Sequence, residues 1–220
     1  MWWDDIRALP SIVAGDIPGG SSHIHATAVI EPGAIIDDGP GPIVIGAGSR
    51  ICTGALLRGP IVIGENCLIG NQSMLRGPIR IGDSVRVGFA SEIKQALIAG
   101  RVSIGPLCFV ADSKIDEDAY LGGEVRTSNH RLDRKEVTVR DGAREIATGL
   151  EKLGCWIGAR ASLGVQVIVL PGRVVAPDSM FEPRVTITRN HPSGRYRVKQ
   201  IIEQVQGEGV GYGQVHSLRR

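Results

Sequence analysis

The sequence predicts an all-β fold, a triangular parallel β-solenoid built from hexapeptide repeats. The hexapeptide GPIVIG occurs at 41–46 and at 59–64, and GPIRIG follows at 77–82, so near-copies recur every eighteen residues. Apolar residues also recur at every sixth position in one unbroken register. That register comprises Ile45, Ile51, Leu57, Ile63, Ile69, Leu75, Ile81, Val87 and Ile93. A unit of six residues cannot bury its apolar side alone, so the units must stack.

The period of six differs from the two ordinary amphipathic patterns. An amphipathic helix needs apolar spacings of three and four, and a half-buried strand needs strict alternation. Three six-residue faces would instead close one eighteen-residue coil, and coils would stack ~4.8 Å apart as paired strands. Glycines that follow the apolar position, such as Gly46, Gly64 and Gly82, suit the tight corners. Two shorter runs of the same period, over 24–36 and 157–187, extend the solenoid toward both ends.

The repeat divides the chain into three parts. We expect 1–22 to be an N-terminal capping leader with a short helix near 4–8, because the open end of a solenoid needs cover. The solenoid domain is predicted over 23–189. The C-terminal tail, 190–220, is predicted to hold a helix near 198–206 and then flexible, glycine-rich chain.

One polar segment interrupts the solenoid. The six-residue period stops over 126–152, which we interpret as an excursion that projects from the prism. Within it, 136–140 and 143–147 resemble two strands around a type I′ turn at Asp141-Gly142. Excursions from a rigid scaffold commonly carry function, so this protruding hairpin is a candidate part of a site.

Composition excludes several classes of partner. A net charge of +2 gives no reason to expect nucleic acid or an anionic membrane as a partner. No apolar stretch is long enough to span a membrane and no secretion signal opens the chain, so we expect a cytoplasmic protein without a membrane partner. The cysteines lack zinc-ligand spacing, and we expect buried thiols and no metal. They are Cys52, Cys67, Cys108 and Cys155.

Several motifs resemble those of the hexapeptide-repeat acyltransferases, and most closely the acetyltransferase half of the bifunctional enzyme that makes UDP-N-acetylglucosamine. The likeness covers most of 24–187. It implies a left-handed parallel β-helix, a homotrimer, and an acyl-CoA such as acetyl-CoA as co-substrate. The nucleotidyltransferase half of that enzyme has no counterpart here, so a separate nucleotidyltransferase is a candidate partner. The motifs are Leu75-Arg76, VGFASEIK at 87–94, VADS at 110–113, LGG at 121–123, TSN at 127–129, TG at 148–149 and KLG at 152–154.

The resemblance assigns roles to three residues that this chain retains. The family's arginine and lysine at the positions of Arg76 and Lys94 contact a phosphate-bearing sugar. Their chemistry suits that role, because a guanidinium offers phosphate two parallel hydrogen bonds and an ammonium offers a point charge. The asparagine at the position of Asn129 belongs to the acetyl-CoA side of the site. We assign Gly123, in the counterpart of the family's glycine-rich turn, to the same side.

Other family positions carry different residues. The family's general base is a histidine, and its position is occupied here by Pro106, which has no group that can accept a proton. A tyrosine and an asparagine of the family's substrate site correspond to Phe109 and Tyr120, which remain our candidates for substrate contact. The family's mechanism therefore lacks its base at the expected position.

His130 is the best-placed substitute for the missing base, because it follows Asn129 at the start of the excursion. The competing interpretation is that His130 is a solvated loop residue, since catalysis must be argued from the geometry of a site. The remaining histidines lie in the first coil or the tail. They are His23, His25, His191 and His216.

Two functions remain open. The first is transfer of an acyl group from acyl-CoA to an amino- or hydroxy-sugar phosphate or a nucleotide sugar, at a site between subunits of a trimer. The second is a catalytically degenerate trimeric module that binds a sugar nucleotide or serves as a scaffold. Pro106 and Phe109 favour the second, whereas Arg76, Lys94 and Asn129 favour the first. A metal site across a subunit interface would need three histidines, and the coils offer no suitable set.

Overall fold

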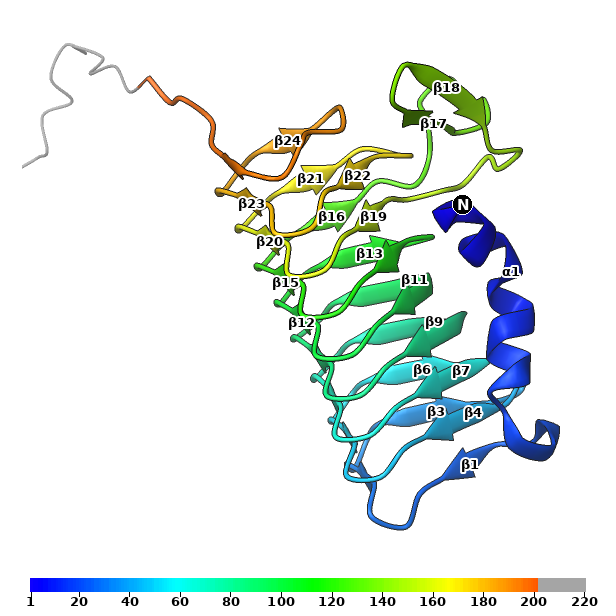
Figure 1. Ribbon diagram of the computed structural model, residues 1–220. Helices are drawn as coiled ribbons and strands as arrows, with labels where there is room; N and C mark the ends of the chain where they lie inside the picture. The colour runs from blue at the N-terminus through cyan, green and yellow to red at the C-terminus, as the bar shows by residue number, and fades with distance from the viewer. Residues whose placement is uncertain (202–220) are drawn as a thin grey trace, which may run out of the picture.

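The protein is a left-handed parallel β-helix, so the predicted fold class is confirmed (Figure 1). The structure is a computed structural model and describes residues 1–201. Very short parallel strands form three faces around a narrow interior, and each coil pairs with the coil before it. Most strands are only two or three residues long. The stability of the domain therefore depends on the stacking of coils and not on any single unit.

The first face carries Arg76, Lys94 and Phe109, three of the residues that the sequence analysis selected. Its strands are β3 (Ile35–Asp37), β6 (Leu56–Arg58), the start of β9 (Met74–Ile81), the start of β11 (Glu92–Ile98), β13 (Phe109–Ala111), β16 (Arg126–Thr127), β21 (Ile168–Val169) and β24 (Thr186–Ile187).

The second face follows the first around a corner of the prism. Its strands are β1 (His23–Ile24), β4 (Ile43–Ile45), β7 (Ile61–Ile63), the ends of β9 and β11, β14 (Lys114–Ile115), β19 (Trp156–Ile157) and β22 (Val174–Val175). The third face is a separate sheet. It contains β2 (Val29–Ile30), β5 (Arg50–Ile51), β8 (Leu68–Ile69), β10 (Arg86–Val87), β12 (Ser103–Ile104), β15 (Tyr120–Leu121), β20 (Ser162–Leu163), β23 (Met180–Phe181) and β25 (Arg195–Tyr196).

The core is a column of aliphatic side chains. Every residue of the unbroken six-residue register, from Ile45 to Ile93, is buried in one cluster with the later run from Ile157 to Ile187. In the first coil, by contrast, Ile24 is 42% exposed because no coil lies below it.

The N-terminal segment forms a longer helix than the sequence suggested. This helix lies along a side of the prism and not over its open end (Figure 1). Helix α1 (Trp2–Gly15), followed by the 3-10 turn Pro18–Gly20, runs along the second face and does not cross an open end (Figure 1). Its buried Leu9 and Val13 pack against Val44 and Val62 of that face. The apolar stripe of the helix is therefore used to cover a side of the prism, which explains why it extends beyond 4–8.

The excursion leaves the coil after Thr127 and not at Arg126, because both residues belong to β16. Arg126 pairs with Phe109 and Ile168, and Thr127 pairs with Val169. It contains the antiparallel hairpin β17 (Thr138–Asp141) and β18 (Arg144–Ala147). The central turn residues are Gly142 and Ala143, and of the two only Gly142 has a positive φ, 57°. A type I′ turn requires positive φ at both, so the predicted turn type is wrong although the hairpin forms.

The hairpin packs onto the start of helix α1. Trp2 and Trp3 are buried in one cluster with Val137, Val139 and Leu153. The Lys114 ammonium binds the Asp5 carboxylate at 2.7 Å, which ties the helix to β14. The helix thus connects the first coils to the excursion along the outside of the prism.

The tail beyond the solenoid is described only in part. Residues 198–201 are not helical, and the rest of the helix expected over 198–206 lies outside the described residues. Within residues 1–201, no helix is long and apolar enough to cross a membrane.

Candidate functional site

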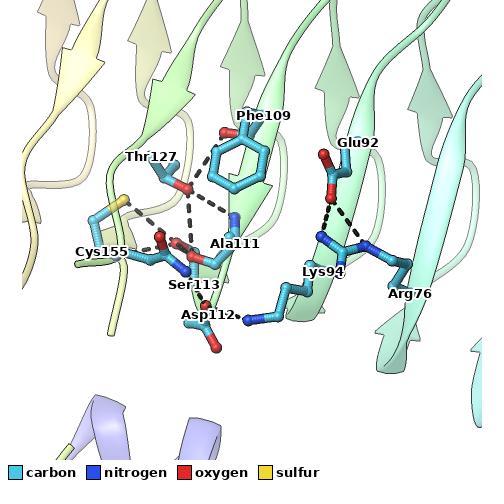
Figure 2. Close-up of polar contacts among 10 residues, drawn as sticks. Arg76, Glu92, Lys94, Phe109, Ala111, Asp112, Ser113, Thr127 and Cys155 are labelled. Atoms are coloured by element: carbon cyan, nitrogen blue, oxygen red, sulfur yellow. Dashed lines mark hydrogen bonds and ion pairs between the residues drawn. The ribbon is translucent and has the colours of Figure 1, made fainter. Parts of the chain in front are cut away.

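Two of the three retained family residues meet on one carboxylate. The Lys94 Nζ donates a hydrogen bond to Oδ2 of Asp112 at 3.2 Å (Figure 2). The Asn129 amide donates to the same oxygen. The three residues lie where the first face turns into the second, at what we call the first corner. They come from three successive coils, so the stacking of the solenoid brings them together.

The coil shortens at this corner, which turns Asp112 into the cluster. Leu56 pairs with Met74, eighteen positions on, but Glu92 pairs with Phe109, seventeen positions on. The register shift falls between Lys94 and Ala96 in β11. One residue fewer makes the turn tighter, and Asp112 adopts a positive φ of 48°. The register of six breaks here because the corner is one residue shorter than the corners before it.

The Asp112 carboxylate is buried, so it needs partners that offset the cost of its burial. Its side chain is 4% exposed and that of Lys94 is 18% exposed. A buried carboxylate without a cation would be costly, and the ammonium and the amide together compensate it. The cluster therefore holds Lys94 and Asn129 in fixed positions relative to each other.

Arg76 forms the neighbouring pair. It stacks between Arg58 and Lys94 in the register of the first face, and its Nε donates to Oε1 of Glu92 at 2.9 Å (Figure 2). Arg58 binds Asp37 in the same way at 2.8 Å. The first corner thus carries a ladder of three cations, and each cation has a carboxylate partner.

Buried hydroxyl groups support the corner. The Thr127 hydroxyl accepts a hydrogen bond from the Ala111 amide at 2.8 Å, and the Ser113 hydroxyl donates to the Ala111 carbonyl at 2.7 Å. The returning excursion closes over them, because the Gly154 amide donates to the Asp112 carbonyl at 2.8 Å. A Cβ on Gly154 would lie 2.0 Å from the Ser113 hydroxyl, so only glycine fits this crossing.

His130 lies beside the cluster, in the wall of a pocket of about 540 Å³ between the excursion and the turn after β21. The volume is in the range of small-molecule sites. The histidine is exposed and its backbone bridges to Lys152. Ser128 and His130, the residues on either side of Asn129 in the chain, both line this pocket. The Asn129 amide instead binds Asp112. The wall of the pocket includes Ser128, His130, Arg131, Val137, Leu170 and Arg173.

The remaining sequence candidates lie away from this corner. Phe109 is half-buried on the first face, where it pairs with Glu92 of the preceding coil. Pro106 and Gly123 are stacked at the corner between the third and first faces, which we call the second corner; a Cβ on Gly123 would lie 3.5 Å from the Pro106 side chain. Tyr120 is on the third face and 51% exposed. One chain thus brings together Lys94 and Asn129 but not Tyr120 or Gly123.

Two residues of this region were missed by sequence reasoning as site residues. Asp112 was used only as a motif anchor, and its role as the shared acceptor depends on the shortened corner. Arg173 follows a Leu-Pro-Gly turn, and nothing in the sequence indicates that it lines a pocket. Its place there depends on how the hairpin folds back.

The four cysteines are buried thiols, and we expect them to be unreactive in the folded protein. Burial raises the pKa of Cys108 to about 11 and that of Cys155 to about 12. Because the thiolate is the nucleophile, both thiols stay protonated at pH 8. Titration with a chromogenic disulfide at pH 8 should be slow for the native protein and complete in urea. Rapid reaction of either residue in the native protein would contradict this placement.

Comparisons with known proteins agree with this architecture. Residues 60–95 match the family model described as bacterial transferase hexapeptide (six repeats). The chain is 47% identical over 206 residues to the uncharacterized acetyltransferase YaiX of Escherichia coli O6:K15:H31 (strain 536 / UPEC), covering 91% of this chain and 88% of that protein.

Two further matches are more distant. The bifunctional sugar-1-phosphate nucleotidylyltransferase/acetyltransferase of Sulfurisphaera tokodaii is 32% identical over 105 residues, which is 48% of this chain and 26% of that protein. Among solved structures, the UDP-N-acetylglucosamine acyltransferase from Campylobacter jejuni aligns with 74% of this chain and 68% of its own, at 17% identity and a TM-score of 0.38. Family membership rests on the long match to the Escherichia coli protein and not on these two.

Proposed function

The chain belongs to the hexapeptide-repeat acyltransferases, and from that premise we propose that it transfers an acyl group from acyl-CoA to an amino- or hydroxy-sugar phosphate or a nucleotide sugar. The observation that carries the proposal is the Lys94–Asp112–Asn129 cluster beside a pocket lined by His130. Acetyl-CoA is the first acyl donor to test.

The acceptor's phosphate is proposed to bind Arg76 and Lys94. Arg76 uses Nε and Nη2 for Glu92, which leaves its other terminal nitrogen for a ligand. Lys94 has three N–H donors and uses one for Asp112. An incoming phosphate can therefore bind both cations without breaking either ion pair, through charge-assisted hydrogen bonds.

His130 is proposed as the general base, and Asn129 as a contact of the acyl-CoA. The acceptor's amine or hydroxyl attacks the thioester carbonyl and forms the new C–N or C–O bond, while its proton passes to the imidazole. The C–S bond then breaks, and the CoA thiolate takes that proton. Pro106 at the family's usual base position cannot do this, so an alternative base is required if the protein turns over.

A homotrimer is proposed because one chain leaves the candidate residues apart. Lys94 lies at the first corner, whereas Gly123 and Tyr120 lie at or beyond the second corner. A neighbouring copy that sets its second corner against the first would bring the two groups together. An apolar ridge along the second corner supports such packing, since Phe89 is 53%, Leu107 45% and Val165 46% exposed.

Replacing Phe89 by aspartate is expected to dissociate the proposed assembly, because a charge would enter the interface at the place where the Phe89 ring would be buried. Sedimentation velocity should show a trimer for the wild type and for the Phe89→Leu control, and a monomer for Phe89→Asp. A monomeric wild type, or a trimeric Phe89→Asp, would contradict the proposed interface.

Calorimetry with acetyl-CoA tests the proposed donor. We expect saturable binding with a Kd at or below about 1 mM, the upper end of common enzyme substrate constants. Asn129→Ala should weaken the binding, whereas Arg58→Ala, at the far end of the cation ladder, should not. Absence of binding at millimolar acetyl-CoA would overturn the transferase proposal.

The second candidate, a degenerate sugar-nucleotide-binding or scaffold module, is favoured by Pro106 and by the internal neutralisation of all three cations. It predicts sugar-nucleotide binding without binding of acyl-CoA, so the same calorimetry separates the two functions. A separate nucleotidyltransferase partner and a cytoplasmic location stay predictions.

A further inference from the structure

Arg173 is a half-buried cation whose Nε atom is buried without a partner within residues 1–201. It lies in the turn between β21 and β22, in the wall of the pocket that also contains His130. Its Nε atom is buried and has no hydrogen-bond partner among the described residues. Buried polar groups in proteins are almost always satisfied, and an orphan commonly marks a bound water, ion or ligand.

The charges around Arg173 do not balance. Burial lowers the pKa of Arg173, and repulsion from Arg140 and Arg131 lowers it further, whereas Glu145 acts in the opposite direction. Arg131 is already bound to Asp133 through two hydrogen bonds of 2.9 and 2.7 Å. The pocket wall itself contains two guanidinium groups, those of Arg131 and Arg173, and one carboxylate, that of Asp133. The pocket therefore has a net positive charge that an anion would relieve.

The backbone fixes Arg173 at this point. The preceding Gly172 passes so close to the hairpin that an added Cβ would lie 2.3 Å from the Thr138 carbonyl oxygen. Val137 and Leu170 give the pocket an apolar wall next to the cation. The pocket thus pairs one positive end with an apolar side, which suits an organic phosphate better than a bare metal or a peptide.

We propose that this pocket binds a phosphate group of a phosphorylated small molecule, with Arg173 as the residue that holds the phosphate. The Arg173 guanidinium presents a fork of N–H donors that matches two phosphate oxygens, and Ser128 and His130 line the same pocket. The site is separate from the Lys94 cluster, since none of Lys94, Asp112 and Asn129 lines this pocket. It does not depend on acyl transfer, because a phosphate could bind here in an inactive protein.

Thermal unfolding and calorimetry with inorganic phosphate test the proposal, in sodium chloride of matched ionic strength. Phosphate should raise the midpoint of the wild type and of Arg160→Gln, a control whose exposed arginine pairs with Asp178 at 2.6 Å. The rise should be clearly smaller for Arg173→Gln, where only the phosphate site proposed at Arg76 and Lys94 remains, and the affinity of the Arg173 pocket for phosphate should fall at least tenfold. Without phosphate, Arg173→Gln should unfold at the same temperature or higher, because an N–H group that is buried without a partner is removed.

Two outcomes would overturn the proposal. One is an equal phosphate effect on the wild type and Arg173→Gln. The other is a lower midpoint for Arg173→Gln without phosphate, matched by Glu145→Gln, which would make Arg173 a structural partner of Glu145. Calorimetry with CoA and with glucosamine 1-phosphate then assigns the source of the phosphate, since the ligand whose affinity falls in Arg173→Gln is the one bound here. Failure of acyl transfer would leave the phosphate result unchanged.

Discussion

Replacing His130 by alanine is expected to lower kcat by at least about 100-fold, the smaller end of the range for loss of a general acid–base group. The imidazole is the proposed acceptor of the proton that leaves the attacking amine, and without it that proton must go to water. Because His130 is exposed in the wall of a pocket, its removal should leave the thermal midpoint unchanged. CoA release at saturating substrates measures the effect.

His25→Ala is the matched control. This histidine is exposed in the first coil, where its Nδ1 lies 2.9 Å from the Thr27 hydroxyl, far along the prism from the pocket. It should retain the full kcat. Full activity of His130→Ala would remove His130 from the mechanism and leave the transfer without an identified base.

Replacing Lys94 by alanine is expected to destabilise the protein by about 3 kcal/mol, since it leaves the Asp112 carboxylate buried without its cation. Asn129 alone donates one neutral hydrogen bond to the same oxygen. The free energy of unfolding in urea measures the loss. The variant should also lose binding of the acceptor's phosphate, because the ammonium is a proposed contact.

Two variants control for this effect. Lys94→Ala combined with Asp112→Asn should recover most of the stability, because the new amide carries no charge that needs a cation. Phosphate binding should not recover, because the ammonium is still missing. Arg160→Ala breaks a pair whose side chains are more than half exposed, and it should cost no more than about 1 kcal/mol. If Lys94→Ala costs as little as Arg160→Ala, the cluster does not hold the corner together.

The solenoid could be predicted because its signal is repeated. Each of the register positions from Ile45 to Ile93 carries the same information, and a period of six has few physical solutions. The length and position of helix α1 were harder to predict. Its apolar residues pack against Val44 and Val62, and the sequence alone does not show that the second face is covered there. The turn at Gly142 depends on the register of the hairpin, which the glycine alone does not determine.

The site could be predicted in part. Motif resemblance selected Lys94 and Asn129, and both contact Asp112. The role of Asp112 follows from a one-residue shortening of the coil, which a regular period of six cannot forecast. Arg173 is near His130 only because the excursion folds back onto the turn after β21. Sequence patterns report periodic packing well, and they report contacts across irregular loops poorly.

Release of CoA from acetyl-CoA, measured with and without an amino-sugar phosphate, tests the central claim most directly. The buried cysteines should contribute little background to a thiol assay. The proposed function predicts release that depends on the acceptor, saturates with it, and disappears in His130→Ala. Release no faster than the rate without acceptor, for amino- and hydroxy-sugar phosphates and nucleotide sugars alike, would contradict it.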